Sequence, residues 1–157
     1  MKRYRRKNFK YFKYYATAFI YLLLVTILVS LSTIVLHELG HFIFSYLVGC
    51  QKIKIILSFD NGNISTYTEM ACPQSINTFL LGVSGFFILL PISILFFLIS
   101  KEGEKYLALI MIGFNFIVSA SDFEMYLKLP YSDTISILIG SMIIILGEIL
   151  LIEKSIF

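Results

Sequence analysis

The chain contains two histidines, and both belong to the pentapeptide His37-Glu38-Leu39-Gly40-His41. On a helix, a spacing of four residues places two imidazoles on one face, where both can bind the same metal ion. The glutamate beside the first histidine can then act as a general base on an attacking water, while zinc lowers the pKa of that water and polarises a carbonyl group. The motif therefore indicates metal-dependent hydrolysis, with His37 and His41 as ligands and Glu38 as base.

A third metal ligand has to come from elsewhere in the chain, because catalytic zinc usually takes three protein ligands and a water. With no further histidine and only two cysteines, we expect a carboxylate, and the candidates in or beside apolar runs are Asp122, Glu148 and Glu124. Asp122 ends a long apolar stretch among small residues that let helices approach closely. Glu148 could face the lipid headgroups, and Glu124 could pair with Lys128 four residues later. We rank Asp122 first, Glu148 second and Glu124 third.

The composition of the whole chain places this motif in a membrane. The 157 residues suffice for one domain, and 58% of them are hydrophobic while 15% are charged. A typical soluble domain has about half apolar and about a quarter charged residues, so this composition excludes a soluble globular protein. A carboxylate in the centre of a bilayer costs roughly 2.5–3.5 kcal/mol, and such residues are usually functional. Glu38 therefore points to a metal site rather than to a helix with two chance histidines.

Residues 1–13 form a basic and aromatic tail. This stretch holds seven of the thirteen Lys and Arg residues. Basic residues beside a membrane span favour the cytoplasmic side and attract anionic lipids, and these two effects account for the charge without a nucleic-acid partner. We therefore expect a cytoplasmic tail followed by a single membrane-embedded domain over residues 14–157.

The apolar runs predict four to five transmembrane segments. The first run, 14–49, is too long for one simple span of about 20 residues and barely long enough for two. It could form two short spans that turn near Ser30–Thr33, or one long tilted helix. Three further runs cover about 77–100, 106–127 and 133–152.

A polar interval separates the first run from the second. Alternating β-forming residues flank Asp60-Asn61-Gly62-Asn63, and an Asn-Gly in this setting is typical of a β-hairpin, here at about 51–70. The hairpin could pair with an extended substrate peptide, or it could lie against the membrane and plug one side of the bundle. The predicted fold class is an all-α polytopic membrane protein with a short β-hairpin between the helix of the histidine motif and the next span.

The histidine motif in an apolar segment, the hairpin after it and an aspartate at the end of a later span resemble the site-2 protease family of intramembrane zinc metalloproteases. The resemblance covers roughly residues 30–130. It implies that His37, His41 and Asp122 hold Zn²⁺ and that Glu38 activates water. It also implies that the substrates are membrane-anchored proteins, cleaved within or beside a transmembrane segment in the lipid bilayer.

The chain departs from the family pattern in two places. The family's aspartate motif is rich in Asn and Pro before the Asp and has Gly after it. Here Asn115 lies upstream without a Pro before Asp122, and Phe123 follows. Residues 82–87 stand where the family often has Gly-Pro-x-x-Asn, but lack its Pro and Asn, and we interpret their glycines as helix-packing residues. Asn115 could contact the substrate backbone, or its amide could bond between helices.

The topology and the cysteines are linked. The resemblance places the zinc site toward the cytoplasm, which agrees with a cytoplasmic tail only if residues 14–49 form two short spans. We favour that arrangement, with five membrane segments in an integral protein of the cell membrane. It predicts that Cys50 and Cys72 are free thiols on the cytoplasmic side. One long helix would instead deliver both to the outside, where an oxidising compartment could join them.

The sequence thus predicts an intramembrane zinc endopeptidase. The alternative is a catalytically inactive metal-binding membrane protein that binds or regulates a membrane partner. Zinc content separates both from a structural subunit whose histidines serve helix packing, and loss of proteolysis in Glu38→Gln separates the enzyme from the inactive metal protein.

Overall fold

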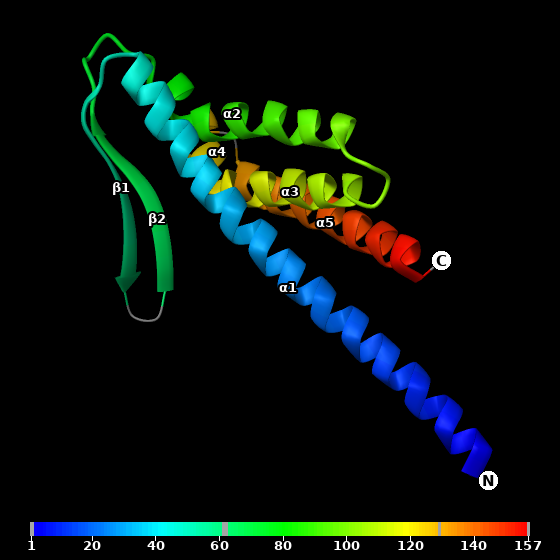
Figure 1. Cartoon of the computed structure of the whole chain (residues 1–157). Helices are drawn as coiled ribbons and strands as arrows, with labels where there is room; N and C mark the ends of the chain where they lie inside the picture. Colours follow the sequence, from blue (N-terminus) through cyan, green and yellow to red (C-terminus); the bar gives the residue numbers. More distant parts are fainter. Residues whose placement is uncertain (1, 61–62, 129, 157) are drawn as a thin grey trace.

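The computed structural model describes residues 2–60, 63–128 and 130–156, which form helices and one hairpin (Figure 1). In chain order the elements are α1 (Lys2–Leu47), β1 (Gln51–Asp60), β2 (Asn63–Ala71), α2 (Thr78–Ile99), α3 (Lys105–Val118), α4 (Ala120–Leu127) and α5 (Ser132–Ile156). Within the described residues, four helical stretches are long and apolar enough to cross a membrane: Phe19–Leu47, Thr78–Ile99, Lys105–Tyr126 and Ser132–Lys154. The prediction of a mostly helical, multi-pass membrane protein with a hairpin after the histidine motif is confirmed at this level.

The favoured division of residues 14–49 into two short spans is wrong. The helix α1 runs without a break through this segment and crosses α2, α3 and α5 obliquely (Figure 1). At the expected turn, the Ser32 hydroxyl donates to the Leu28 carbonyl and the Thr33 hydroxyl to the Val29 carbonyl, each at 2.8 Å. These hydroxyls bond to the preceding turn of the same helix, so nothing there interrupts it. A fifth span is not found among the described residues.

The hairpin lies at the end of α1, and its register explains why the prediction of two free thiols is wrong. The strands β1 and β2 pair antiparallel, with Gln51 opposite Ala71. This pairing brings the flanking residues Cys50 and Cys72 together, and they form a disulfide. The residues of the predicted turn, 61–62, lie outside the described part of the chain.

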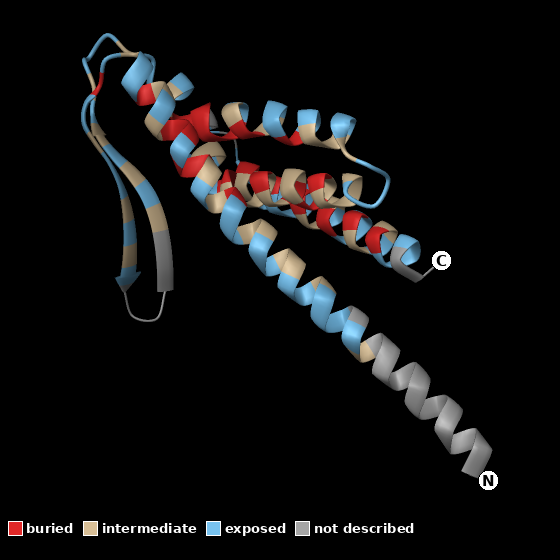
Figure 2. Cartoon of the chain, in the orientation of Figure 1, coloured by how far each residue is buried: buried red, intermediate tan, exposed pale blue. Residues whose placement is uncertain are grey.

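The helices pack through small residues and leave an apolar outer surface. The backbones of α3 and α5 cross closely at Gly113 and Gly140, where a Cβ on either glycine would lie 2.6 or 2.5 Å from the other's carbonyl oxygen. Buried residues lie in α1 where it meets α2 and α4, in the first half of α2, and along the facing sides of α3 and α5 (Figure 2). The outer faces of the helices are largely exposed. Exposed side chains such as Leu28 and Leu98 are apolar, as expected for helices whose outer faces contact lipid.

Candidate metal centre

Three potential metal ligands converge where α1 passes α4. The Asp122 Oδ2 atom lies 3.0 Å from His37 Nε2 and 3.2 Å from His41 Nε2, and the two ring nitrogens are 3.1 Å apart. In a tetrahedral zinc site with bonds of about 2.0–2.1 Å, neighbouring ligand atoms lie about 3.3 Å apart. The three atoms therefore form a triangle of nearly the size that one such ion requires.

The three groups come from two helices, the histidines from α1 and the aspartate from α4. The two histidines lie one turn apart on α1, so both side chains extend from the same face of the helix. Asp122 lies in the first turn of α4, directly after α3 ends at Val118. Both histidines are buried, and Asp122 is half-buried at the wall of a cavity. The group could hold a metal ion.

The hydrogen bonds behind the histidines orient them for a cation. The Nδ1 atom of His41 lies 3.1 Å from the Leu81 carbonyl oxygen. A carbonyl only accepts, so Nδ1 carries the proton, and in the neutral ring Nε2 presents its lone pair to the triangle. On the other ring, Nδ1 of His37 lies 3.4 Å from the Ser119 hydroxyl. The carbonyl partner thus fixes the tautomer of His41, and the hydroxyl contact helps to orient the ring of His37. The donor chemistry therefore suits a metal ion, because two imidazole nitrogens and a carboxylate oxygen meet at one point.

A glycine of α2 makes room for both rings. A Cβ at Gly85 would lie 2.7 Å from both His37 Cε1 and His41 Nε2. The facing residue on α1 is Gly40, where a Cβ would lie 2.9 Å from the Gly85 Cα atom. The interpretation of Gly85 as a helix-packing residue therefore accounts for its contact with Gly40, but it did not include the contact with the two histidine rings. Nothing in the local sequence of α2 signals the contact with the histidine rings.

Glu38 lies in the same cavity but is not one of the three converging groups. Its side chain is buried, and its Oε2 atom accepts a hydrogen bond of 2.7 Å from the Thr68 hydroxyl of β2. A second bond, in which Ser45 of α1 donates to the Met70 sulfur at 2.9 Å, also fixes β2 over this helix. Sequence reasoning did not identify Thr68, since only the folded hairpin brings it to the motif.

The cavity beside these groups has a volume of about 410 Å³. Its wall is formed by α1, β2, the start of α2, the end of α3 and α4, with Thr66, Tyr67, Thr68 and Tyr126 among the lining residues. A cavity of this size, with a few polar groups among apolar ones, is typical of a ligand-binding site.

The other candidate residues lie elsewhere. Glu148 accepts a hydrogen bond of 3.0 Å from Thr26 between α5 and α1, and Glu124 is exposed on α4. Asn115 is fully buried, and its Nδ2 donates to the Phe86 carbonyl at 3.2 Å. It is not among the described residues that line the cavity. The structure thus brings Asp122 to the histidines, and it places Asn115 in an interhelical bond, one of the two roles considered for it.

Comparisons of the chain with family models, with curated proteins and with solved structures found no match.

Proposed function

We propose that this protein is an intramembrane zinc endopeptidase that hydrolyses peptide bonds within or beside the transmembrane segments of membrane-anchored proteins. One observation carries the proposal. A His-His-Asp group and a separate buried carboxylate, Glu38, share a cavity between helices that are apolar enough to cross a membrane. A buried carboxylate in such a helix is costly, and this cost favours a functional explanation.

The donor set fits zinc in number and type. Two imidazole nitrogens and one carboxylate oxygen leave a fourth tetrahedral position open. When bound there, zinc would supply Lewis-acid polarisation of the scissile carbonyl and a water of lowered pKa. His37, His41 and Asp122 would hold the ion, and the bonds from His41 to Leu81 and from His37 to Ser119 would keep the rings in place.

Glu38 would be the general base. Its carboxylate would accept a proton from the attacking water and return it to the leaving amine, so that one C–N bond is hydrolysed to a carboxyl and an amino group. The Thr68 hydroxyl would hold one oxygen of this carboxylate, at the 2.7 Å that the structure gives. The other oxygen would face the reacting groups.

The hairpin supports the binding of an extended substrate segment. Thr66, Tyr67 and Thr68 are consecutive in β2, and all three line the cavity. Side chains of successive strand residues point to opposite faces of a strand, so one face alone could not bring three consecutive residues to the cavity. The edge of β2 must therefore also border the cavity. Within the described residues, β2 pairs only with β1, and a substrate chain unwound from its helix could add to the other edge.

The test is the variant Glu38→Gln, which preserves shape but cannot accept the proton. We expect purified Glu38→Gln to contain as much zinc as the unaltered chain. In cells, sequencing of protein termini in the membrane fraction should reveal new termini in or beside transmembrane segments with the unaltered chain and none with the variant.

The zinc content and the set of protein termini also distinguish the peptidase from the alternative function. Zinc in both proteins with identical sets of termini would refute the peptidase and leave a non-enzymatic metal protein that binds or regulates a membrane partner. Loss of zinc in Glu38→Gln would show instead that Glu38 has a ligating or structural part.

A further inference from the structure

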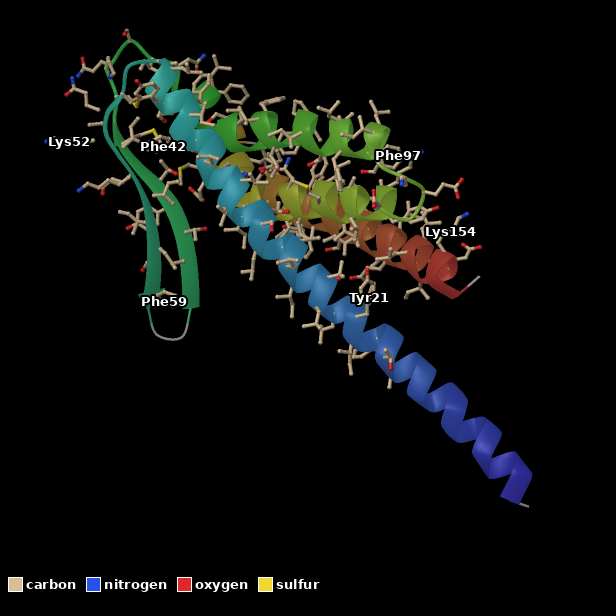
Figure 3. All side chains as sticks on the ribbon, in the orientation of Figure 1. Tyr21, Phe42, Lys52, Phe59, Phe97 and Lys154 are labelled. Carbon is tan, nitrogen blue, oxygen red and sulfur yellow. A yellow bond between two sulfur atoms is a disulfide. The ribbon has the colours of Figure 1, made fainter. Side chains whose placement is uncertain are left out.

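The two ends of the helical bundle differ in charge and in chemistry. One end, here called the tail face, comprises the Tyr21 region of α1, the turn at 101–104 and the C-terminal end of α5. Tyr21, Lys101 and Lys154 line one pocket there, and the Lys154 ammonium donates to Glu102 at 2.8 Å. These contacts place the three parts at the same level, as the positions of Tyr21 and Lys154 in Figure 3 also indicate.

The opposite end, here called the hairpin face, comprises the Cys50–Cys72 disulfide, β1, β2 and, between α4 and α5, residues 128, 130 and 131. Lys52 and Phe59 of β1 both lie far from Lys154 (Figure 3). The ring of Tyr126, near the end of α4, lies against Gly82 in the first turn of α2. The end of α4 is therefore on this face.

The basic residues are divided unequally between the two faces. Seven lie in residues 2–13, and with Lys101, Lys105 and Lys154 they place ten of the thirteen on the tail-face side. The hairpin face has the other three, at positions 52, 54 and 128. Lys and Arg in short flanking segments favour the cytoplasmic side of a membrane. The charge pattern therefore assigns the tail face to the cytoplasm.

The disulfide gives an independent indication of the same orientation. Disulfides form and persist in oxidising compartments and are rare in the cytosol. Cys50 lies three residues after the end of α1 at Leu47 and Cys72 directly follows β2, so the bond lies on the hairpin face. Because α1 is one continuous helix whose stretch Phe19–Leu47 is long and apolar enough to cross a membrane, we expect this face and the basic tail on opposite sides of it.

The metal group is near the hairpin face. His41 lies six residues before the end of α1 at Leu47, which is about 9 Å along a helix. Its partner Leu81 is in the first turn of α2, about 27 Å along that helix from Ile99 at the tail-face end. Thr68 of the hairpin bonds to Glu38 itself.

We propose that the metal site opens on the non-cytoplasmic side of the membrane, so that its substrates are membrane-anchored polypeptides whose scissile bond lies in the outer part of the bilayer or just beyond it. The orientation stands by itself, whereas the statement about substrates rests on the proposed peptidase function. The family resemblance implies the opposite orientation. That expectation required two short spans in residues 14–49, whereas α1 is one continuous helix through this segment.

The orientation can be read with single introduced cysteines. Among the described residues no cysteine is free, so Lys54→Cys on the hairpin face and Gly103→Cys on the tail face each add one free thiol to the full chain. A Cβ at Gly103 has no neighbour within 4 Å, and neither variant removes a basic residue from the tail face. Intact and permeabilised cells would be treated with a membrane-impermeant maleimide.

We expect Lys54→Cys to be labelled fully in intact cells, and Gly103→Cys only after permeabilisation. The unaltered chain should remain unlabelled in both conditions. The reverse pattern, or labelling of the unaltered chain at Cys50 and Cys72 only after permeabilisation, would overturn the orientation.

The substrate class is tested separately, by sequencing the termini of membrane-fraction proteins that appear with the unaltered chain and not with Glu38→Gln. We expect them in the outer part of transmembrane segments or just outside it, and termini at cytoplasmic ends would overturn the substrate assignment. If no such termini appear while the maleimide pattern is as expected, the peptidase function fails together with its substrate class, and the orientation is retained.

Discussion

The substitution Gly85→Ala tests whether the packing of α2 against α1 shapes the metal centre. The new methyl group would lie 2.7 Å from His37 Cε1 and His41 Nε2 and 2.8 Å from His37 Nε2. These atoms belong to the two rings that are proposed to bind the ion. The methyl group cannot turn away, because it is attached directly to the backbone of α2.

The size of the effect follows from these distances. Ordinary van der Waals contact begins near 3.4 Å, so the rings or the helices would have to separate by about 0.7 Å, whereas metal ligands must keep their distances within about 0.2 Å. Loss of a hydrogen-bonding partner behind a ligand typically costs about 10- to 100-fold in metal affinity. Direct displacement of two ligands should cost more, so we expect zinc affinity to fall by at least about 100-fold.

The assay is a zinc titration of purified full-length protein in detergent, in competition with a chelating dye, together with thermal unfolding followed by circular dichroism. Gly113→Ala is the matched control, because its Cβ would lie 2.6 Å from the Gly140 oxygen and from Ile144. Both variants overpack a helix crossing, which costs about 1–3 kcal/mol, but only Gly85→Ala touches the histidines. If folded Gly85→Ala bound zinc as tightly as Gly113→Ala, the proposed arrangement of ligands would be wrong.

Three further outcomes are expected. In the same titration, Asp122→Ala should lose most of the zinc affinity while Glu148→Ala keeps it, since the latter carboxylate bonds to α1 away from the histidines; equal losses would contradict Asp122 as the third ligand. Thr68→Val should retain zinc and slow the Glu38-dependent cleavage by about 10- to 100-fold, because a hydrogen bond to a charged group contributes about 1.5–3 kcal/mol, and Thr68→Ser should restore most of the rate. A rate for Thr68→Val equal to that of the unaltered chain would remove the positioning role. Reduction of the Cys50–Cys72 disulfide should leave zinc bound, increase amide hydrogen exchange in β2 and lower the rate of cleavage, whereas unchanged exchange would show that the other contacts of the hairpin suffice to hold it.

The sequence by itself determined the features that depend on local pattern. The spacing of His37 and His41 places both rings on one face of any helix, whatever surrounds it. The apolar runs and the Asn-Gly flanked by alternating residues likewise depend on neighbours in the chain, and so predicted the helices and the hairpin. Asp122 could be ranked above Glu148 because small residues precede it, but the sequence could not decide between them.

Only the tertiary structure decided which distant residues meet. His37 and Asp122 are 85 positions apart, and their contact depends on how α1 crosses α3 and α4. The same crossing requires glycine at position 85, and the folding of the hairpin brings Thr68 to Glu38. The continuity of α1 was undecidable from local signals, because serine and threonine hydroxyls near residue 32 can either end a helix or bond back into it. In the structure they bond back into it, and this puts the disulfide and the basic tail at opposite ends of the helix.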